Sequence, residues 1–411
     1  MQVFTSSVLE TDVAIVGGGV AGSSLGAALA AAGTGVAVVE RETRFRDRIR
    51  GEALHPWGAA EADRLGLTPL LEASGAQRLP IWQRYQDREP LDPYCWADDV
   101  PGGHVEWAVS HPQLQETLLR HAEANGARLL RPARAVSFRH TSGGAELDVA
   151  LAEEAIVLRA RLVVGADGSR ALSRRWLGAS THRDPVHHAI GGALLDGVSL
   201  ATNAAHQAHL AGAMTVVFPR GEGRARLYYV CDPDRAAALR GDHAPDIIEA
   251  AAEALPARAF ANATVAGPIG FFPGADLWSD HLAAEAIVLV GDAAGANDPS
   301  QGHGLSLAFR DARELSDLLL GERGWPRAGA EFADRRQRYF APLRAHAQWV
   351  GSLWVDQGSE AEQRRERVKR AREADPAAGG YSLIHALGPD GLTADEAARR
   401  HFFGEDLPDP A

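Results

Sequence analysis

Six residues near the N-terminus, Gly17 to Gly22 (GGGVAG), restrict the possible folds more than any other segment. The apolar run Asp12–Val16 before them predicts a buried parallel strand, and the Ala-rich segment Val20–Ala32 predicts a helix. The helix begins at Val20 and Ala21, whose unpaired N–H groups and positive dipole end attract phosphates. A glycine turn between such a strand and such a helix predicts a βαβ unit that binds a dinucleotide.

Each glycine that matters in this turn has its own steric reason. Gly17 permits the tight turn, Gly19 lets the backbone approach a pyrophosphate, and Gly22 lets helix and strand pack closely. A second buried strand, Val36–Val39, ends at Glu40, which is placed to accept hydrogen bonds from ribose hydroxyls. This motif alone is compatible with both NAD and FAD.

A second motif near residue 290 distinguishes the two cofactors. Ala286–Val290 predicts another buried strand, and Gly291 and Asp292 follow it directly. A dinucleotide that carries a ribitol is longer than NAD and needs an acceptor at about this distance from the first motif. Asp292 alone is a weak signal, because an acid after a strand is often a helix N-cap. Joined to the first motif, it predicts bound FAD.

The rest of the chain predicts an α/β fold in which a Rossmann-like FAD-binding domain is interleaved with an antiparallel-sheet substrate domain, followed by a helical C-terminal tail. Alternating runs such as Thr215–Phe218 and Arg226–Val230, joined by Gly-rich turns, indicate the antiparallel sheet. The charged segment Gln357–Ala374 predicts a solvated helix. We expect FAD-binding parts at residues 1–75, 106–182 and 273–345, substrate-domain parts at 76–105 and 183–272, and the tail at 346–411.

Composition excludes several classes of function. The net charge of −12 argues against nucleic acid as a partner, since its phosphates need clusters of Lys and Arg. The two cysteines, Cys95 and Cys231, are far apart and form no metal-ligand pattern, so we expect no disulfide framework, no metal and a cytoplasmic setting. No secretory signal and no apolar stretch long enough for a membrane span is expected.

With three motifs in this order, the sequence resembles the single-component flavin monooxygenases typified by para-hydroxybenzoate hydroxylase, over about residues 12–320. The resemblance implies FAD contacts from the ADP-binding fingerprint, the arginine run, the Asp-Gly motif, the ribitol motif and the loop beside the isoalloxazine. In this sequence these are Gly17, Gly19, Val20, Ala21, Gly22, Glu40, Arg41, Arg48, Arg50, Asp167, Gly291, Asp292, Pro299, Gly302, His303 and Gly304.

Four positions depart from the family's usual pattern. His111 stands where the family usually has Arg or Gln near the cofactor, and we include it among the expected FAD contacts. Ala171 stands where a Ser commonly follows the Asp-Gly motif. Gly295 replaces a frequent His, and His303 replaces a frequent Gln.

The resemblance also implies a reaction. In that family NAD(P)H, bound transiently, reduces FAD, and a C4a-hydroperoxyflavin formed with O₂ hydroxylates or epoxidises an aromatic or polyketide-like small molecule. The helix that opens near Gly304 would place its positive end at the negative charge of reduced flavin. A flavin-dependent halogenase, an O₂-independent reductase or dehydrogenase, and a flavin-bearing binding protein are the alternatives. A halogenase uses a Lys near the flavin and a Trp-x-Trp-x-Ile-Pro motif, whereas the single lysine here, Lys369, lies in the charged tail and that motif is absent.

The sequence does not single out a catalytic base. His55, Trp57 and His303 are the candidates for side chains near the flavin and the substrate, although His55 and Trp57 are equally ordinary residues of a helix start. Several aromatic residues of the middle segment are expected in the sheet core, and some of them in the lining of the substrate pocket: Phe218, Tyr228, Tyr229, Phe271 and Phe272.

Overall fold

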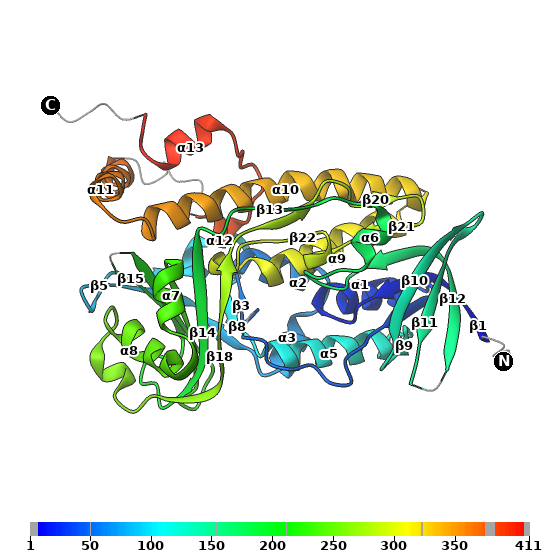
Figure 1. The fold of residues 1–411 in the computed structure, drawn as a ribbon, viewed down its shortest axis with the longest axis horizontal. Coiled ribbons are helices and arrows are strands. Elements are labelled where there is room, and N and C mark those ends of the chain that lie inside the picture. Colours follow the sequence, from blue (N-terminus) through cyan, green and yellow to red (C-terminus); the bar gives the residue numbers. More distant parts are fainter. Residues whose placement is uncertain are drawn as a thin grey trace.

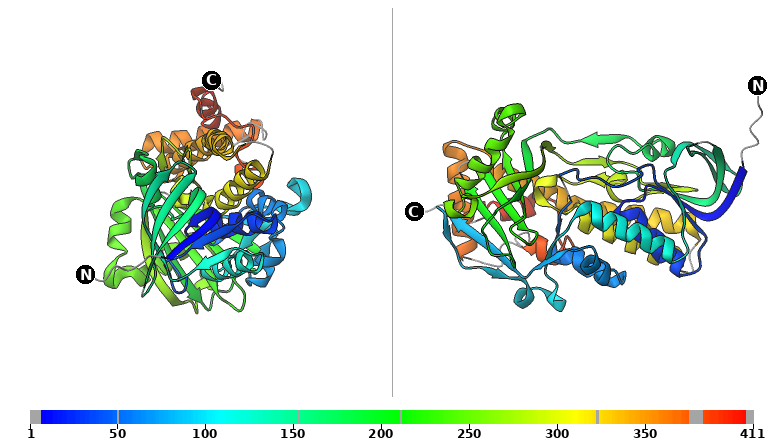
Figure 2. Two further views of the ribbon diagram at one scale, coloured as in Figure 1. Left: turned by 90° about the vertical axis from the view of Figure 1, so that its right-hand side faces the viewer. Right: turned by 90° about the horizontal axis from the view of Figure 1, so that it is seen from below.

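The computed structural model describes residues 7–49, 51–152, 154–210, 212–321, 324–374 and 383–406. Figures 1 and 2 show an elongated molecule with a mainly parallel sheet towards one end and a mainly antiparallel sheet towards the other. The predicted α/β class, with both kinds of sheet and a helical C-terminal region, is confirmed.

The dinucleotide-type segments form the first sheet, in the order β10-β11-β12-β1-β2-β9, with β21 paired to the end of β12 and β20 paired to β21. Strands β21, β12, β1, β2 and β9 are parallel to one another, so their carboxyl ends share one edge. The strands are β1 (Ser7–Val16), β2 (Val36–Val39), β9 (Arg128–Leu130), β10 (Arg134–Thr141), β11 (Gly144–Ala150), β12 (Ala155–Gly165), β20 (Ala283–Ala284) and β21 (Ile287–Leu289).

Helices cover one face of this sheet because alternate strand residues there are apolar and fully buried, for example Val13, Ile15 and Val164. Against them pack α1 (Val20–Ala31), α5 (His111–Ala124), α9 (Gly304–Leu320) and the start of α10 (Trp325–Trp354). A second apolar cluster on the other face is closed by the hairpin of β10 and β11.

The second sheet has the order β18-β14-β17-β16-β15-β5-β6, with β7 paired to β5. Its pairs are antiparallel except β15 with β5, which are parallel. Its strands are β5 (Ile81–Gln86), β6 (Glu89–Pro90), β7 (Tyr94–Cys95), β14 (His188–Asp196), β15 (Ala204–Leu210), β16 (Ala213–Pro219), β17 (Ala225–Cys231) and β18 (Thr264–Gly274). One face packs on α7 (Pro233–Ala238) and α8 (Ile247–Ala252), and the other faces the FAD-type segments.

Short elements connect the two sheets. Two three-stranded sheets have the orders β3-β8-β4 and β13-β19-β22. Their strands are β3 (Ala53–Leu54), β4 (Gln77–Leu79), β8 (Glu106–Ala108), β13 (Thr181–Arg183), β19 (Leu277–Ser279) and β22 (Gly295–Ala296). The connecting helices are α2 (Pro56–Arg64), α3 (Thr68–Ala73), α4 (Trp96–Asp99), α6 (Ser173–Leu177) and the 3-10 turns η1 (Pro101–Gly103), η2 (Gly241–Asp246), η3 (Ala257–Phe260), η4 (Gly291–Ala293) and η5 (Pro299–Gln301).

The C-terminal region consists of α10, α11 (Ser359–Ala374), α12 (Ile384–Leu387) and α13 (Glu396–Phe402). Helix α10 has 30 residues and extends along one side of both halves (Figure 1). It runs without a break through residues 345 and 346, where the sequence pattern suggested the start of the tail. Aromatic side chains of α10 and α13 pack with Trp57 of α2, which joins this region to the FAD-type half.

Candidate functional site

The glycine turn between β1 and α1 has the steric properties expected of it. Gly17 has φ +109°, and a Cβ there would lie 2.3 Å from the carbonyl oxygen of Ala166. A Cβ on Gly22 would lie 2.0 Å from the carbonyl oxygen of Gly17, so this position accepts only glycine. A Cβ on Gly19 would instead meet only the Gln115 side chain, at 3.7 Å. The backbone is therefore tightly packed at Gly17 and Gly22, whereas the space beside Gly19 is open to a ligand.

Glu40, at the end of β2, braces this turn. Its carboxylate is buried and accepts hydrogen bonds from the backbone N–H groups of Gly18 and Glu42, each at 2.7 Å. Because a carboxylate has further lone pairs, these bonds leave acceptor capacity for a ribose hydroxyl.

The predicted arginine contacts lie beside Glu42. Arg41 is 3.5 Å and Arg48 is 2.8 Å from a Glu42 carboxylate oxygen, and both side chains are about half exposed. Arg50 lies outside the described residues. Contacts of these arginines with FAD stay predictions.

His111 is the first residue of α5, and its Nδ1 lies 2.9 Å from the carbonyl oxygen of Gly51. The ring thereby holds the loop that follows the arginine run. Its expected cofactor contact also stays a prediction.

The second motif forms a tight turn at the same edge of the sheet. Gly291 has φ +58°, and its N–H donates to the Asp311 carboxylate at 2.7 Å. Arg174 donates to the backbone carbonyls of Asp292, Ala293 and Ser169 at 2.5, 2.7 and 2.8 Å. The Asp292 carboxylate is partly exposed and forms no hydrogen bond with the part of the chain that the structure describes. The turn is thus fixed through its backbone while this side chain stays available.

Asp311 and Arg174 were not predicted from the sequence. The Asp311 carboxyl also accepts a hydrogen bond from Tyr339 Oη at 2.5 Å and lies 3.4 Å from Arg336 Nε. Burial outweighs the Arg336 guanidinium and raises the pKa of this carboxyl. An acid on the apolar face of the helix Leu305–Leu320 is the signal that would have identified Asp311.

Asp167, after β12, has several partners in its own loop. Its carboxylate accepts hydrogen bonds from the N–H groups of Leu172 and Ser173, at 2.6 and 3.1 Å, and from the Ser173 hydroxyl at 2.5 Å. Ser173 thus supplies a hydroxyl near the Asp-Gly motif, where Ala171 lacks one. The structure gives Asp167 a role in shaping this loop, and its contact with FAD stays a prediction.

The loop before α9 is held by two buried acids, Asp298 and Asp276, and the Asp276 carboxyl accepts a hydrogen bond from the Asp298 N–H at 3.1 Å. Asp298 caps η5 by accepting from the Ser300 N–H at 2.9 Å, and its other oxygen lies 3.1 Å from His188 Nε2. Pro299 begins η5, and Gly302, with φ +70°, ends it. A Cβ on Gly304 would meet no atom within 4 Å. The N-terminus of α9 therefore has open space beside it, like Gly19.

The three candidate side chains His55, Trp57 and His303 come together beneath the start of α9. The His303 ring centroid lies 5.0 Å from that of His55 and 6.0 Å from that of Trp57. His303 is completely buried, and within the described residues neither of its ring nitrogens has a hydrogen-bond partner. Burial holds its pKa well below the usual value, so the ring is neutral.

His55 is the residue before α2 and is bonded at both ring nitrogens. Its Nδ1 lies 2.9 Å from Glu106 Oε2, and its Nε2 lies 2.8 Å from the carbonyl oxygen of Gln301. The His55 ring therefore ties α2 to the loop that precedes α9.

The antiparallel sheet divides the predicted aromatic residues between its two faces. Phe218, Tyr228 and Phe272 lie on the face turned towards the FAD-type segments, in a cluster with Ala53 and other apolar residues. Tyr229 and Phe271 lie on the opposite face, against α7 and α8. Tyr229 and Phe271 therefore belong to the core, and a role of the other three in lining a substrate pocket stays a prediction.

A buried ionic network lies on the same inner face. Arg226 of β17 is fully buried, and its Nη2 lies 2.6 Å from both Asp47 Oδ2 and Glu52 Oε1. Tyr228 donates a hydrogen bond to the other Glu52 oxygen. Desolvation outweighs Arg226 and raises the pKa of Glu52. The network connects the antiparallel sheet to the loop before β3.

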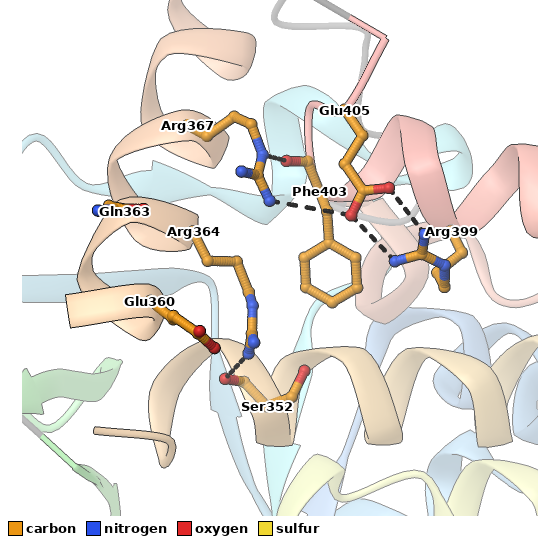
Figure 3. A pocket seen from close by; sticks show the side chains of 8 residues that line it. All are labelled: Ser352, Glu360, Gln363, Arg364, Arg367, Arg399, Phe403 and Glu405. Atoms are coloured by element: carbon orange, nitrogen blue, oxygen red, sulfur yellow. Dashed lines mark hydrogen bonds and ion pairs between the residues drawn. The ribbon is translucent and has the colours of Figure 1, made fainter. Parts of the chain in front are cut away.

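A cavity of about 390 Å³ lies between α10, α11 and α13 (Figure 3). Its arginines already have partners: Arg364 donates to the Ser352 carbonyl at 2.8 Å, and Arg399 lies 2.7 Å from Glu405. None of the predicted site residues lines it. It is separate from the candidate site.

No helix within the described residues is long and apolar enough to cross a membrane.

Comparisons with known proteins agree with this geometry. The sequence matches the profile of the family described as FAD binding domain over residues 10–327. Rifampicin monooxygenase of Streptomyces venezuelae is 28% identical over 332 residues, which are 77% of this chain and 66% of the relative. Menaquinone reductase of Mycobacterium tuberculosis is 33% identical over 178 residues, which are 43% of this chain and 42% of the relative. The chain thus spans about two thirds or less of the length of these relatives.

Among solved structures, p-nitrophenol 4-monooxygenase PnpA of Pseudomonas putida DLL-E4 superposes with a TM-score of 0.79. The alignment covers 94% of this chain and all of PnpA, at 19% sequence identity. At that identity the likeness establishes the shared fold.

Proposed function

Because this chain belongs to the FAD binding domain family, we propose that it is an FAD-dependent monooxygenase. It uses NAD(P)H and O₂ to hydroxylate or epoxidise an aromatic or polyketide-like small molecule. One observation carries the proposal: the turn at Gly19 and the Asp292 turn lie at one edge of the parallel sheet, each with free backbone or side-chain groups. Membership in the FAD binding domain family supports the assignment of these groups to FAD.

The described residues fit the cofactor. Gly19 is open to a pyrophosphate, Glu40 retains acceptor capacity for a ribose, and Asp292 offers a carboxylate for the ribitol. When bound, FAD supplies hydride acceptance from NAD(P)H and the activation of O₂. The protein supplies position, charge and exclusion of water.

The N-terminus of helix α9 supplies the positive end of a helix dipole. This N-terminus has open space beside Gly304, and the dipole favours negative charge there by about 0.3–1 kcal/mol when exposed and about 2 kcal/mol when partly buried. The loop before it cannot shift freely, because Asp298 and His55 both hold it. This rigidity fixes the helix end relative to any group bound against it.

Beside the Arg226–Glu52 network, the inner face of the antiparallel sheet is lined by apolar and aromatic side chains that exclude water. Phe218, Tyr228 and Phe272 lie there among buried aliphatic side chains. Such a lining disfavours water and proton leakage around an oxygen-reactive centre. It also suits an apolar or aromatic substrate.

The experiment is a screen of phenols and polyketides for stimulated NAD(P)H oxidation under labelled O₂, with product mass measured in the presence of chloride and bromide. Gain of one labelled oxygen is the expected result. A halogenated product would indicate a halogenase, and a reduced product without oxygen would indicate a reductase. Flavin retained without turnover of any compound would favour a binding protein. Peroxide release is measured in parallel, since it separates unproductive oxidation from oxygen transfer.

A further inference from the structure

Three histidines from distant parts of the chain converge beneath the start of α9. His55 precedes α2, His303 precedes α9, and His385 lies in α12 of the C-terminal region. One ring nitrogen of each lies within 4.8 Å of the corresponding nitrogens of the other two. The His303 and His385 rings are stacked, with centroids 4.9 Å apart.

The hydrogen bonds of these histidines leave some ring nitrogens unsatisfied. His303 is fully buried, and within the described part of the chain neither of its nitrogens has a partner, which is costly for a polar group away from water. His55 lies within hydrogen-bond distance of a carboxylate at one nitrogen and of a carbonyl at the other. Both of these groups are acceptors, so without another ligand the His55 ring has to carry two protons.

We propose that His55, His303 and His385 bind a divalent transition-metal cation of the zinc type, with the Gln301 carbonyl oxygen as a fourth ligand. Imidazole nitrogens suit such ions. The Gln301 oxygen lies 2.8 Å from His55 Nε2 and also interacts with the His385 ring, so it is at the same point of convergence. An ion there gives the buried His303 ring a partner and removes the need for a second proton on His55.

The surroundings of His55 match those of a metal ligand. A histidine that binds a metal through one nitrogen commonly donates its other N–H to a carboxylate, which fixes the ring. Glu106 Oε2, 2.9 Å from His55 Nδ1 and fully buried, occupies that position. Glu106 is therefore a positioning residue for the proposed site.

The geometry requires side-chain adjustments. Zn–N bonds of about 2.0–2.1 Å place tetrahedral ligand nitrogens about 3.4 Å apart. Nitrogens separated by up to 4.8 Å reach this spacing through movements of about 1 Å, and the stacked His303 and His385 rings must also turn so that one lone pair of each points at the ion. With three histidines and a carbonyl the ion has no open position, so the site is structural. It joins α12 to the loop that precedes α9.

The test uses untagged, FAD-loaded protein that has been treated with a chelator and titrated with ZnCl₂ by calorimetry. We expect one high-affinity site in the wild type. Glu106→Gln should weaken Zn²⁺ binding roughly 10- to 100-fold, and His385→Ala and His303→Gln should weaken it by more than that. His209→Gln is the matched control, because His209 is stacked on Trp354 outside the cluster and should leave the affinity unchanged.

X-ray absorption at the zinc edge of the wild-type protein provides a second measurement that needs no variant. Three imidazoles and one oxygen at about 2.0–2.1 Å are expected. The proposal is overturned if the wild type binds no stoichiometric zinc, if His385→Ala binds it equally well, or if the spectrum lacks imidazole scattering. The histidines would then be a hydrogen-bonded cluster without metal.

Discussion

Replacement of Arg226 should disturb the contact between the antiparallel sheet and the loop before β3. Arg226 projects from β17, is fully buried, and lies 2.6 Å from Glu52, whose side chain is 1% exposed. We consider Arg226→Met, which keeps much of the side-chain volume and removes the charge. The second partner, Asp47, is 28% exposed and can be solvated, so the cost falls mainly on Glu52.

The expected loss is about 3–5 kcal/mol, the usual effect of removing one partner of a buried ion pair. This is a large fraction of the roughly 5–15 kcal/mol that stabilises a typical native domain. Replacing both partners, as in Arg226→Met with Glu52→Gln, removes the fully buried ion pair, and the remaining charges, Asp47 and Arg220, are partly exposed to solvent. Gln still accepts the Tyr228 hydroxyl. The double variant should therefore recover most of the loss.

The assay is urea unfolding of the flavin-free proteins, followed by circular dichroism, for the wild type, both single variants and the double variant. The pH dependence of this destabilisation provides an independent test, because its direction can be predicted. Burial already raises the pKa of Glu52, and loss of Arg226 raises it further. A carboxyl whose pKa is higher in the folded than in the unfolded protein favours folding at low pH and disfavours it once the pH exceeds the unfolded pKa. Arg226→Met should therefore be less destabilising at pH 5 than at pH 8. Losses that simply add in the double variant, or an Arg226→Met protein as stable as wild type, would refute the reasoning.

Three further predictions concern the cofactor site and its supports. In a titration of apoprotein, Asp292→Ala should weaken FAD binding about 10- to 100-fold, because it removes a charge-assisted hydrogen bond of roughly 1.5–3 kcal/mol. Asp317→Ala, at an exposed position, is the control and should leave the affinity unchanged. Unchanged FAD affinity of Asp292→Ala with a lowered apo melting temperature would mean that Asp292 only shapes its turn. Burial and the neighbouring Asp298 raise the pKa of Asp276 to about 8, so stability falls as the pH rises from 4 to 8, by a total on the order of 5 kcal/mol. Asp276→Asn, which cannot ionise, should raise the melting temperature more at pH 9 than at pH 5, and an equal shift at both would contradict the raised pKa. Gly22→Ala should abolish FAD retention, because its Cβ would lie 2.0 Å from a backbone oxygen; a variant that still copurifies with FAD would show that the turn can open.

The local pattern was sufficient to predict the elements that carry the motifs. The predicted strand Val36–Val39 is observed with the same bounds, and the predicted helix Val20–Ala32 is observed as Val20–Ala31. The resemblance to the para-hydroxybenzoate hydroxylase type is confirmed by the family match. These successes share a cause, because glycine sterics and apolar periodicity act between residues that are neighbours in the sequence.

The supports of the site depend on contacts between distant residues, which no local pattern encodes. Arg174 holds the Asp292 turn although more than a hundred residues separate them. Helix α10 was not predicted. Its first turns pack on the parallel-sheet half and its later turns pack on the C-terminal region, so its apolar residues do not form one continuous stripe. His385 lies in the predicted helical tail, but no local pattern relates it to His303, and only the fold places the two rings side by side.

The long helix α10 also determines where the protein can be shortened. The family profile ends at residue 327, yet Arg336 and Tyr339, which neutralise and hydrogen-bond the buried Asp311, lie beyond that point. A chain cut at residue 327 would keep every recognisable FAD motif and leave Asp311 as an uncompensated charge directly behind the Gly291–Asp292 turn. Recombination between relatives at this profile boundary is therefore predicted to yield insoluble protein, whereas an exchange placed after Trp354 keeps the acid and its partners in one inherited unit.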